Sequence, residues 1–190
     1  MPKIADIQET PNPNAVKFIL KEPVSRGTSH SFKDEAAAAS DELARSLFMV
    51  GDVVSVFYMD KMITVEKTDE AEWDEILPAL AVPIRAAVTP ASNGGGNGAA
   101  AVAVGGAIAA AAAADDPKVR EIEALLDERI RPYLAGDGGW LEVVELVGNT
   151  LKIRYEGACG SCPSSLTGTL MAIENMIKDE IDPEIEVVAT

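Results

Sequence analysis

Two cysteines, Cys159 and Cys162, are the residues whose type and spacing indicate chemistry in this chain. They are its only cysteines, and glycine, alanine and serine surround them in the stretch GACGSCPSS, residues 157–165. Small neighbours leave both sulfurs open to a metal or a substrate. Cys162 is expected to open a helix, where free backbone N–H groups and the helix dipole stabilise a thiolate. The pattern predicts a thiolate pair that binds metal or reacts as a nucleophile.

The number of ligands limits what this pair can do. Zinc and iron–sulfur clusters normally take four protein ligands, and the one histidine, His30, is expected in a solvated loop far away in the sequence. One chain therefore offers half of a metal site, which a symmetric dimer would complete with four thiolates. The residues leave three interpretations open: a shared iron–sulfur cluster, a redox dithiol and a zinc-bridged dimer. Inert packing is disfavoured, because the pair lies among glycine and serine.

The charge and the N-terminus exclude several classes of function. The net charge is −15, with 9 basic and 15 acidic residues in 1–90 and 7 basic and 16 acidic residues in 115–190. Such a chain repels a phosphate backbone, so nucleic-acid binding is not expected. Two cysteines three residues apart form no disulfide framework, and residues 1–6 resemble neither a secretory signal nor a transit peptide. These features predict a cytoplasmic protein.

The middle of the chain predicts a division into two domains. Residues 89–114 carry no charge and consist mostly of glycine and alanine, which is typical of a flexible linker. We therefore expect small domains at residues 1–88 and 115–190. A membrane span at Ala99–Ala114 is the alternative, but this run is shorter than most spans and poor in leucine, isoleucine and phenylalanine. No membrane contact is expected.

Hydrophobic periodicity predicts an α+β fold in both domains. Residues 1–88 are expected to form a βαββα unit, in which Ser40 caps the first helix and Pro78 and Pro83 kink or end the second. The strands of this unit are expected at residues 15–20, 53–58 and 62–65. Residues 115–190 are expected to form an αββαβ unit, with helices at 117–132 and 162–181, a turn at 136–139, and strands at 140–147, 150–156 and 185–188. The cysteines then lie between the second strand and the second helix.

Several of these motifs resemble those of a known family. Residues 115–190 resemble the C-terminal domain of the NifU-like (Nfu-type) iron–sulfur proteins. Residues 7–87 resemble the Nfu N-terminal domain. The stretches that carry the resemblance are RIRP at 129–132, DGG at 137–139 and GACGSCPSS at 157–165, and in the first domain TPNPN at 10–14, KF at 17–18, LAR at 43–45 and SVF at 55–57. The resemblance covers all of the chain except the linker.

The resemblance implies a scaffold or carrier without catalytic residues of its own. Cys159 and Cys162 would hold a 4Fe–4S cluster, with 2Fe–2S as the alternative, bridging a homodimer. The cluster would arrive from donor or assembly proteins and pass to apo iron–sulfur client proteins. The N-terminal domain would contact partners. The competing function is a thioredoxin-like dithiol–disulfide oxidoreductase that uses the same two cysteines.

Overall fold

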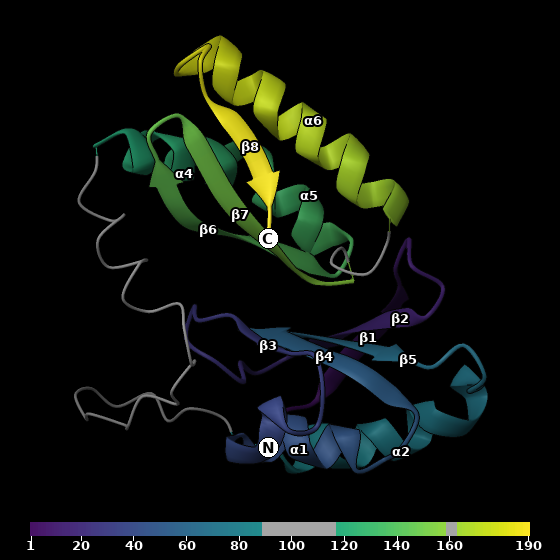
Figure 1. Ribbon diagram of the computed structural model, residues 1–190. Helices are drawn as coiled ribbons and strands as arrows, with labels where there is room; N and C mark the ends of the chain where they lie inside the picture. The colour runs from purple at the N-terminus through teal and green to yellow at the C-terminus, as the bar shows by residue number, and fades with distance from the viewer. Residues whose placement is uncertain (89–116, 159–162) are drawn as a thin grey trace. The chain divides into compact units, whose positions relative to one another are not determined.

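The computed structural model describes residues 1–88, 117–158 and 163–190 (Figure 1). The chain divides into two compact units, residues 1–101 and 102–190, and each has its own hydrophobic core. Both units combine a sheet with helices, which confirms the predicted α+β class. The predicted domain limits at residues 88/89 and 114/115 stay predictions, because residues 89–116 lie outside the described part of the chain.

The N-terminal unit is built on a five-stranded antiparallel sheet. The strand order is β1-β2-β5-β4-β3, so β1 and β3 form the two edges. Strands β4 and β5 form the predicted hairpin, with Met59 opposite Met62, and Asp60 in the turn has a φ of 50°. The strands are β1 (Ile4–Glu9), β2 (Ala15–Leu20), β3 (His30–Phe32), β4 (Val53–Met59) and β5 (Met62–Lys67).

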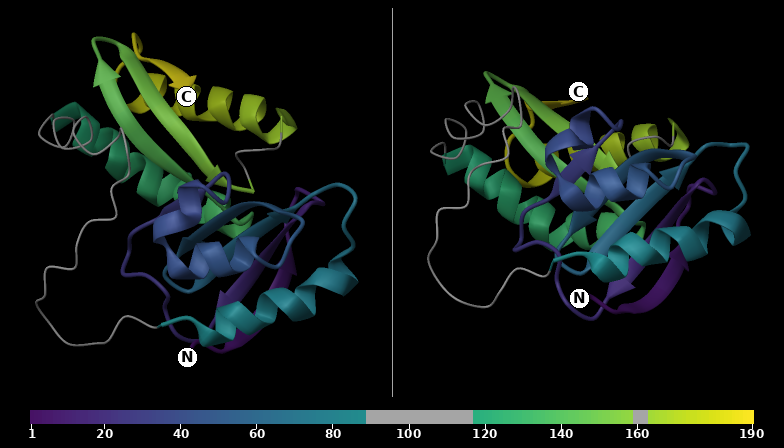
Figure 2. Two further views of the ribbon diagram at one scale, coloured as in Figure 1. Left: turned by 60° about the horizontal axis from the view of Figure 1, so that its bottom comes forward. Right: turned by 90° about the horizontal axis from the view of Figure 1, so that it is seen from below.

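Helices α1 (Glu42–Phe48) and α2 (Trp73–Ala86) cover one face of this sheet (Figures 1 and 2). Leu47 from α1 and Leu80 and Ile84 from α2 are fully buried. They pack against alternate residues of the central strands, among them Phe18, Val56, Ile63 and Val65. The core therefore depends on aliphatic helix side chains that face β-branched and aromatic side chains of the sheet.

One prediction about these helices is wrong, and another is wrong in part. Ser40 is not the cap of α1, because it ends a short 3-10 helix at Ala37–Ser40, and Asp41 accepts the capping bond from the Ala44 N–H at 2.7 Å. Pro78 and Pro83 lie inside α2 without ending it, so only the expected kink stays a prediction. Each proline removes one N–H donor, at a cost of about 3 kcal/mol. The buried face of α2 holds the helix together in spite of that cost.

The edges of the sheet were not predicted correctly either. β1 was missed, because five of its six residues are exposed and show no alternation. His30 lies in the short strand β3 and pairs with Tyr58 in register, so the prediction of a solvated loop residue is wrong. Its ring stacks on the ring of Tyr58, with 4.6 Å between centroids and 18° between planes.

The C-terminal unit has the predicted order, with its first helix divided in two. It contains α4 (Pro117–Arg129), α5 (Arg131–Gly136), β6 (Gly139–Val147), β7 (Thr150–Gly157), α6 (Pro163–Glu180) and β8 (Glu186–Ala189). Strands β6 and β7 are antiparallel, and β8 lies parallel to β7. The predicted hairpin through Gly148 and Asn149 is confirmed by the pairing of Val147 with Thr150. Pro132 lies near the start of α5 and does not close the preceding helix.

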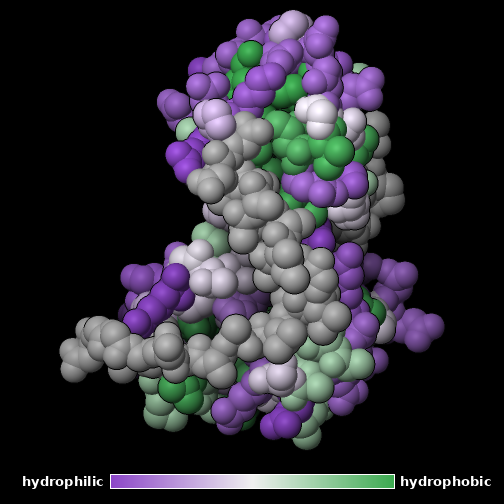
Figure 3. Space-filling view, turned by 60° about the vertical axis from the view of Figure 1, so that its left-hand side comes forward, coloured by the Kyte–Doolittle hydropathy of each residue, from purple (hydrophilic) through white to green (hydrophobic). Residues whose placement is uncertain are grey.

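The core of this unit joins one side of the sheet to all three helices. Leu151, Ile153 and Tyr155 alternate along β7 and are buried, whereas Lys152 and Arg154 between them face away from the core. These two cations pair with Glu145 at 2.7 Å and Glu142 at 3.6 Å across the hairpin. Figure 3 shows that hydrophilic and hydrophobic side chains both reach the visible surface of each unit.

Candidate functional site

Cys159 and Cys162 lie outside the described residues, and so does the predicted opening of the helix by Cys162. The structure describes the chain on both sides of them. Strand β7 ends at Gly157, and α6 begins at Pro163 and runs to Glu180. The cysteines are therefore carried by the connection between a central strand and a long helix.

The residues just before Cys159 are fixed by backbone hydrogen bonds. The Ala158 N–H donates to the Gly138 carbonyl at 3.2 Å, and Gly139 pairs with Gly157 in the β6–β7 ladder. Ala158 is 3% exposed. Gly138 and Gly157 have φ values of 77° and 68°, a region that costs a residue with a Cβ atom about 1–2 kcal/mol. Backbone conformation therefore favours glycine at both positions.

The end of α5 fixes the position of Gly138. The Asp137 N–H donates to the carbonyls of Tyr133 and Leu134 at 3.1 and 3.0 Å, and the Gly138 N–H donates to Ala135 at 3.2 Å. A left-handed glycine just after the last helical turn is a common way to end a helix. The predicted turn at 136–139 is thus shorter than expected, since Gly136 belongs to α5 and Gly139 to β6.

Arg131 connects the helices to the strand that begins at this turn. Its Nε donates to the Leu141 carbonyl at 3.1 Å, and its guanidinium lies 5.2 Å from the centre of the Trp140 ring. The same guanidinium pairs with Asp127 and, at 3.7 Å, with Glu123. Arg131 belongs to the RIRP stretch at residues 129–132, and its role here was not predicted from the sequence. The signal was present, because acidic residues four and eight positions earlier lie on the same side of a helix.

The donor set of the candidate site is the cysteine pair. Among the residues that the structure describes, no group of three or more His, Cys, Asp or Glu could hold a metal ion. Thiolates are soft ligands that suit iron–sulfur clusters and zinc. Within the same described ranges, no helix is long and apolar enough to cross a membrane, and Ala99–Ala114 lies outside them.

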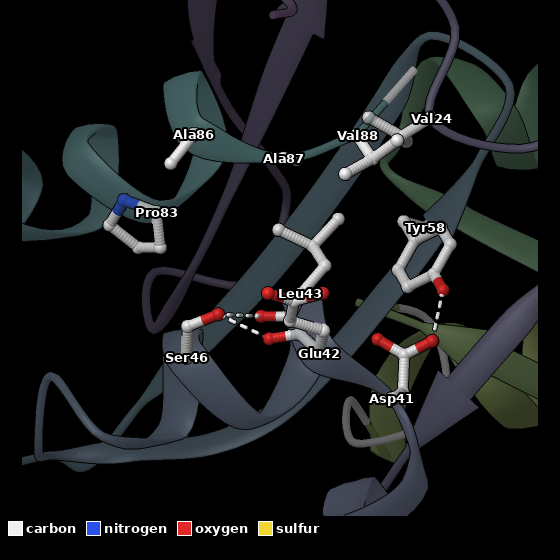
Figure 4. A pocket seen from close by; sticks show the side chains of 10 residues that line it. All are labelled: Val24, Asp41, Glu42, Leu43, Ser46, Tyr58, Pro83, Ala86, Ala87 and Val88. Atoms are coloured by element: carbon white, nitrogen blue, oxygen red, sulfur yellow. Dashed lines mark hydrogen bonds between the residues drawn. The ribbon is translucent and has the colours of Figure 1, made fainter. Parts of the chain in front are cut away.

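A second group of polar side chains lies in the N-terminal unit, in a pocket of about 410 Å³ next to α1 (Figure 4). The Tyr58 hydroxyl donates to Oδ2 of Asp41, whose Oδ1 caps α1. Burial is the main cause that raises the pKa of Tyr58 above 10, and the bond to Asp41 adds to it. Burial lowers the pKa of His30 from 6.5, although Asp41 opposes this shift. The arrangement stabilises a neutral phenol and fixes the start of α1.

Replacing Tyr58 with phenylalanine should destabilise the N-terminal unit by about 1.5–3 kcal/mol near neutral pH, the usual cost of a lost bond to a charged acceptor. Because the folded state raises this pKa, the stabilisation is complete below the unfolded value of about 10 and is lost as the pH rises above it. Between about pH 8 and about pH 11, the free energy of unfolding measured in urea should therefore depend less on pH for Tyr58→Phe than for the wild type. Trp73 fluorescence in a Trp140→Phe background reports this unit.

The control for that experiment is Tyr133→Phe, which removes a hydroxyl from a side chain that is 75% exposed. It should change neither the midpoint of urea unfolding nor its dependence on pH. Equal pH profiles for wild type and Tyr58→Phe would contradict a role for the bond between Tyr58 and Asp41.

Comparisons with known proteins match both units. Residues 4–90 match the family model described as "Scaffold protein Nfu/NifU N terminal", and residues 122–188 match the NifU-like domain. The NFU1 iron–sulfur cluster scaffold homolog, mitochondrial, of Homo sapiens is 34% identical over 94% of this chain and 68% of its own length. The chain belongs to the Nfu/NifU family of iron–sulfur cluster scaffold proteins. The predicted family is therefore confirmed.

Other members of the family are longer than the region that this chain matches. The NFU1 homologs of Drosophila persimilis and Drosophila willistoni are 34% and 35% identical over 94% of this chain. The chain spans 62% and 60% of their lengths, which is less than two thirds. A solution structure of a NifU-like protein from Saccharomyces cerevisiae, 29% identical, matches 42% of this chain and 72% of its own with a TM-score of 0.39.

The predicted cytoplasmic location is contradicted by the NFU1 relatives from Homo sapiens and Drosophila, which are named as mitochondrial proteins. The prediction rested on the first residues of the printed sequence and on the small number of cysteines. The chain matches only part of the length of several relatives, so its first residues do not report on targeting. A pair of reduced thiols is likewise not specific to the cytoplasm.

Proposed function

We propose that this Nfu/NifU protein binds a 4Fe–4S cluster through Cys159 and Cys162, shares it with a second copy of the chain, and transfers it to apo-proteins. One observation carries the proposal: the region that matches the NifU-like domain, residues 122–188, contains the only two cysteines of the chain. A cluster takes four thiolates. Two identical chains related by a two-fold axis supply that number with the fewest additional assumptions.

The described flanks support a thiolate site between them. The hydrogen bond from Ala158 to Gly138 fixes the β7 end of the connection. That end is therefore already in place before a cluster binds. On the other side, α6 extends over 18 residues from Pro163. The first turn of a helix has unpaired N–H groups and a positive dipole end, which favour nearby anions such as thiolates and sulfides.

The cluster is cargo in this proposal, and the protein needs no catalytic residue. Transfer is an exchange of ligands: a thiolate of the client protein binds iron as Cys159 or Cys162 leaves it, and the iron and sulfide keep their oxidation states. The residues next to the cysteines are glycine, alanine, serine and proline. Side chains of this size would leave room for the incoming thiolate.

Anaerobic reconstitution of the full chain with iron and sulfide tests the proposal. The expected product is brown and dimeric and contains about one 4Fe–4S cluster per two chains, because each chain supplies two of the four thiolates. Mössbauer spectroscopy separates this cluster from 2Fe–2S, and sedimentation gives the mass. The loaded protein should then activate an apo iron–sulfur enzyme.

Three other results would contradict the proposal. A colourless monomer that reduces a disulfide substrate would indicate the dithiol oxidoreductase. A dimer that contains zinc and has no visible absorption would indicate a structural metal site. A cluster held by a monomer would show that ligands outside the cysteine pair complete the site.

A further inference from the structure

A groove in the N-terminal unit lies between the edge strand β1, the turn that follows it and helix α2. Its volume is about 590 Å³, within the usual range of ligand-binding pockets. Most of its lining is apolar, and the two charged residues in it, Glu9 and Asp74, are both acidic. Ile7, Trp73 and Leu77 are among its apolar lining residues.

The turn at one end of the groove is fixed by its own polar side chains. The Thr10 hydroxyl donates to the carbonyls of Asn12 and Ala15 at 2.9 and 3.0 Å. The Asn12 side chain accepts from the Asn14 N–H at 3.0 Å and donates to Glu66 on β5 at 3.1 Å. A turn held in this way loses little conformational entropy when a ligand binds.

Trp73 forms a wall of the groove in an equally fixed position. Its indole N–H donates to the Pro13 carbonyl at 3.0 Å, and the Lys67 ammonium lies 5.5 Å from the centre of its ring. Pro11 and Pro13 add rigid apolar surface beside it. Flat aromatic and proline surfaces of this kind suit an extended peptide.

Strand β1 provides the remaining side of the groove. It pairs with β2 on one side and forms the edge of the sheet on the other. Ile7 lines the groove and is 42% exposed. An edge strand next to an apolar groove is a common place for an extended segment of another protein to bind, because it offers backbone hydrogen-bonding groups and pockets for alternate side chains.

We propose that this groove binds an extended segment of a partner protein that has an apolar side chain flanked by lysine or arginine. The apolar side chain would pack against Ile7, Trp73 and Leu77, and the flanking cations would meet Glu9 and Asp74. Charge complementarity supports this choice, because residues 1–90 carry 15 acidic and 9 basic residues. The groove uses neither cysteine, so it binds independently of the cluster.

Two synthetic nonapeptides test the proposal on the full chain: GKVKLKVKG and its acidic counterpart GEVELEVEG. Trp73 fluorescence in the Trp140→Phe background gives the affinity, and amide chemical shifts give the location. The basic peptide should bind with a dissociation constant of roughly 10–300 μM, and the acidic one at least about 10-fold more weakly. The shifts should change in β1, the turn at 10–14 and the first turns of α2.

The variant Glu9→Gln/Asp74→Asn should weaken binding of the basic peptide by about 5–10-fold and reduce its dependence on salt. Both residues are exposed, so the fold should survive, and a thermal melt checks this. The matched control is Glu35→Gln/Glu75→Gln, because Glu35 and Glu75 are exposed acids of the same unit that do not line the groove. This control should bind as the wild type does.

Four outcomes would overturn the proposal. These are equal affinity for the two peptides, equal weakening by the two double variants, and shift changes confined to other parts of the unit. The fourth is a cluster-free chain that is dimeric and becomes monomeric on Ile7→Asp, which would make the groove an interface between copies of this chain.

Discussion

Replacing either Cys159 or Cys162 with alanine should abolish cluster binding. In a homodimer each substitution occurs twice, so one change removes two of the four thiolates at once. We expect the visible absorption of the reconstituted protein to fall by at least about 90%, since the two remaining thiolates cannot hold a cluster. Absorption spectroscopy with iron and sulfide determination measures the loss.

The neighbouring serines provide matched controls. Ser161→Ala and Ser164→Ala change side chains of similar size in the same segment and keep both thiolates, so cluster content should stay near that of the wild type. The apo form of each cysteine variant should unfold at the same urea concentration as wild-type apo protein. Colour that survives Cys159→Ala or Cys162→Ala would contradict the ligand assignment.

Replacing Arg131 with alanine should lower the free energy of unfolding of the C-terminal unit by about 2 kcal/mol. The ion pairs contribute little of this, because Asp127 and Glu123 are 61% and 47% exposed and such pairs are worth well under about 1 kcal/mol. The larger losses are the bond to the Leu141 carbonyl, the contact with Trp140 and the packing of a side chain that is 11% exposed.

The effect of Arg131 should extend to the site, because β6 begins at Gly139 and Gly139 pairs with Gly157. We expect Arg131→Ala to lose its cluster to an iron chelator several-fold faster than the wild type, and hydrogen exchange to speed up at the start of β6. Arg131→Lys should restore only part of the stability, since an ammonium lacks the planar fork of donors.

Arg129→Ala is the control for Arg131. Arg129 lies two residues earlier, is 51% exposed and pairs with Glu180 at 3.3 Å. Its loss should cost no more than about 0.5 kcal/mol and leave the rate of cluster loss unchanged. If the two variants were equally stable, Arg131 would have no special role in positioning this end of the sheet.

The sequence predicted the helices and strands in which apolar and polar residues alternate with a regular spacing. In β7, buried Leu151, Ile153 and Tyr155 alternate with charged residues, and Gly148–Asn149 marks the turn before them. The αββαβ order of the C-terminal unit followed from such patterns. The number of cysteines also limited the ligand set without any structure, because four ligands are needed and two are present.

The elements that were missed depend on tertiary contacts. β1 lies at an edge and exposes most of its residues, so it shows no period, and the three residues of β3 are too few to show one. α2 continues through two prolines because Ile76, Leu80 and Ile84 are buried on one face, a stabilisation that local propensity does not contain. The contacts of Arg131 with Leu141 and Trp140 join residues about ten positions apart in different elements.

The pairing of β8 with β7 has a consequence for protein engineering. The parallel register joins Thr150–Ile153 of β7 to Glu186–Ala189, so it uses the end of β7 far from Gly157. New donor residues grafted between β7 and α6, such as histidines for a harder metal, would thus leave the alignment of these two strands intact. Substitutions confined to the short connection between β7 and α6 could therefore change which metal the C-terminal unit binds.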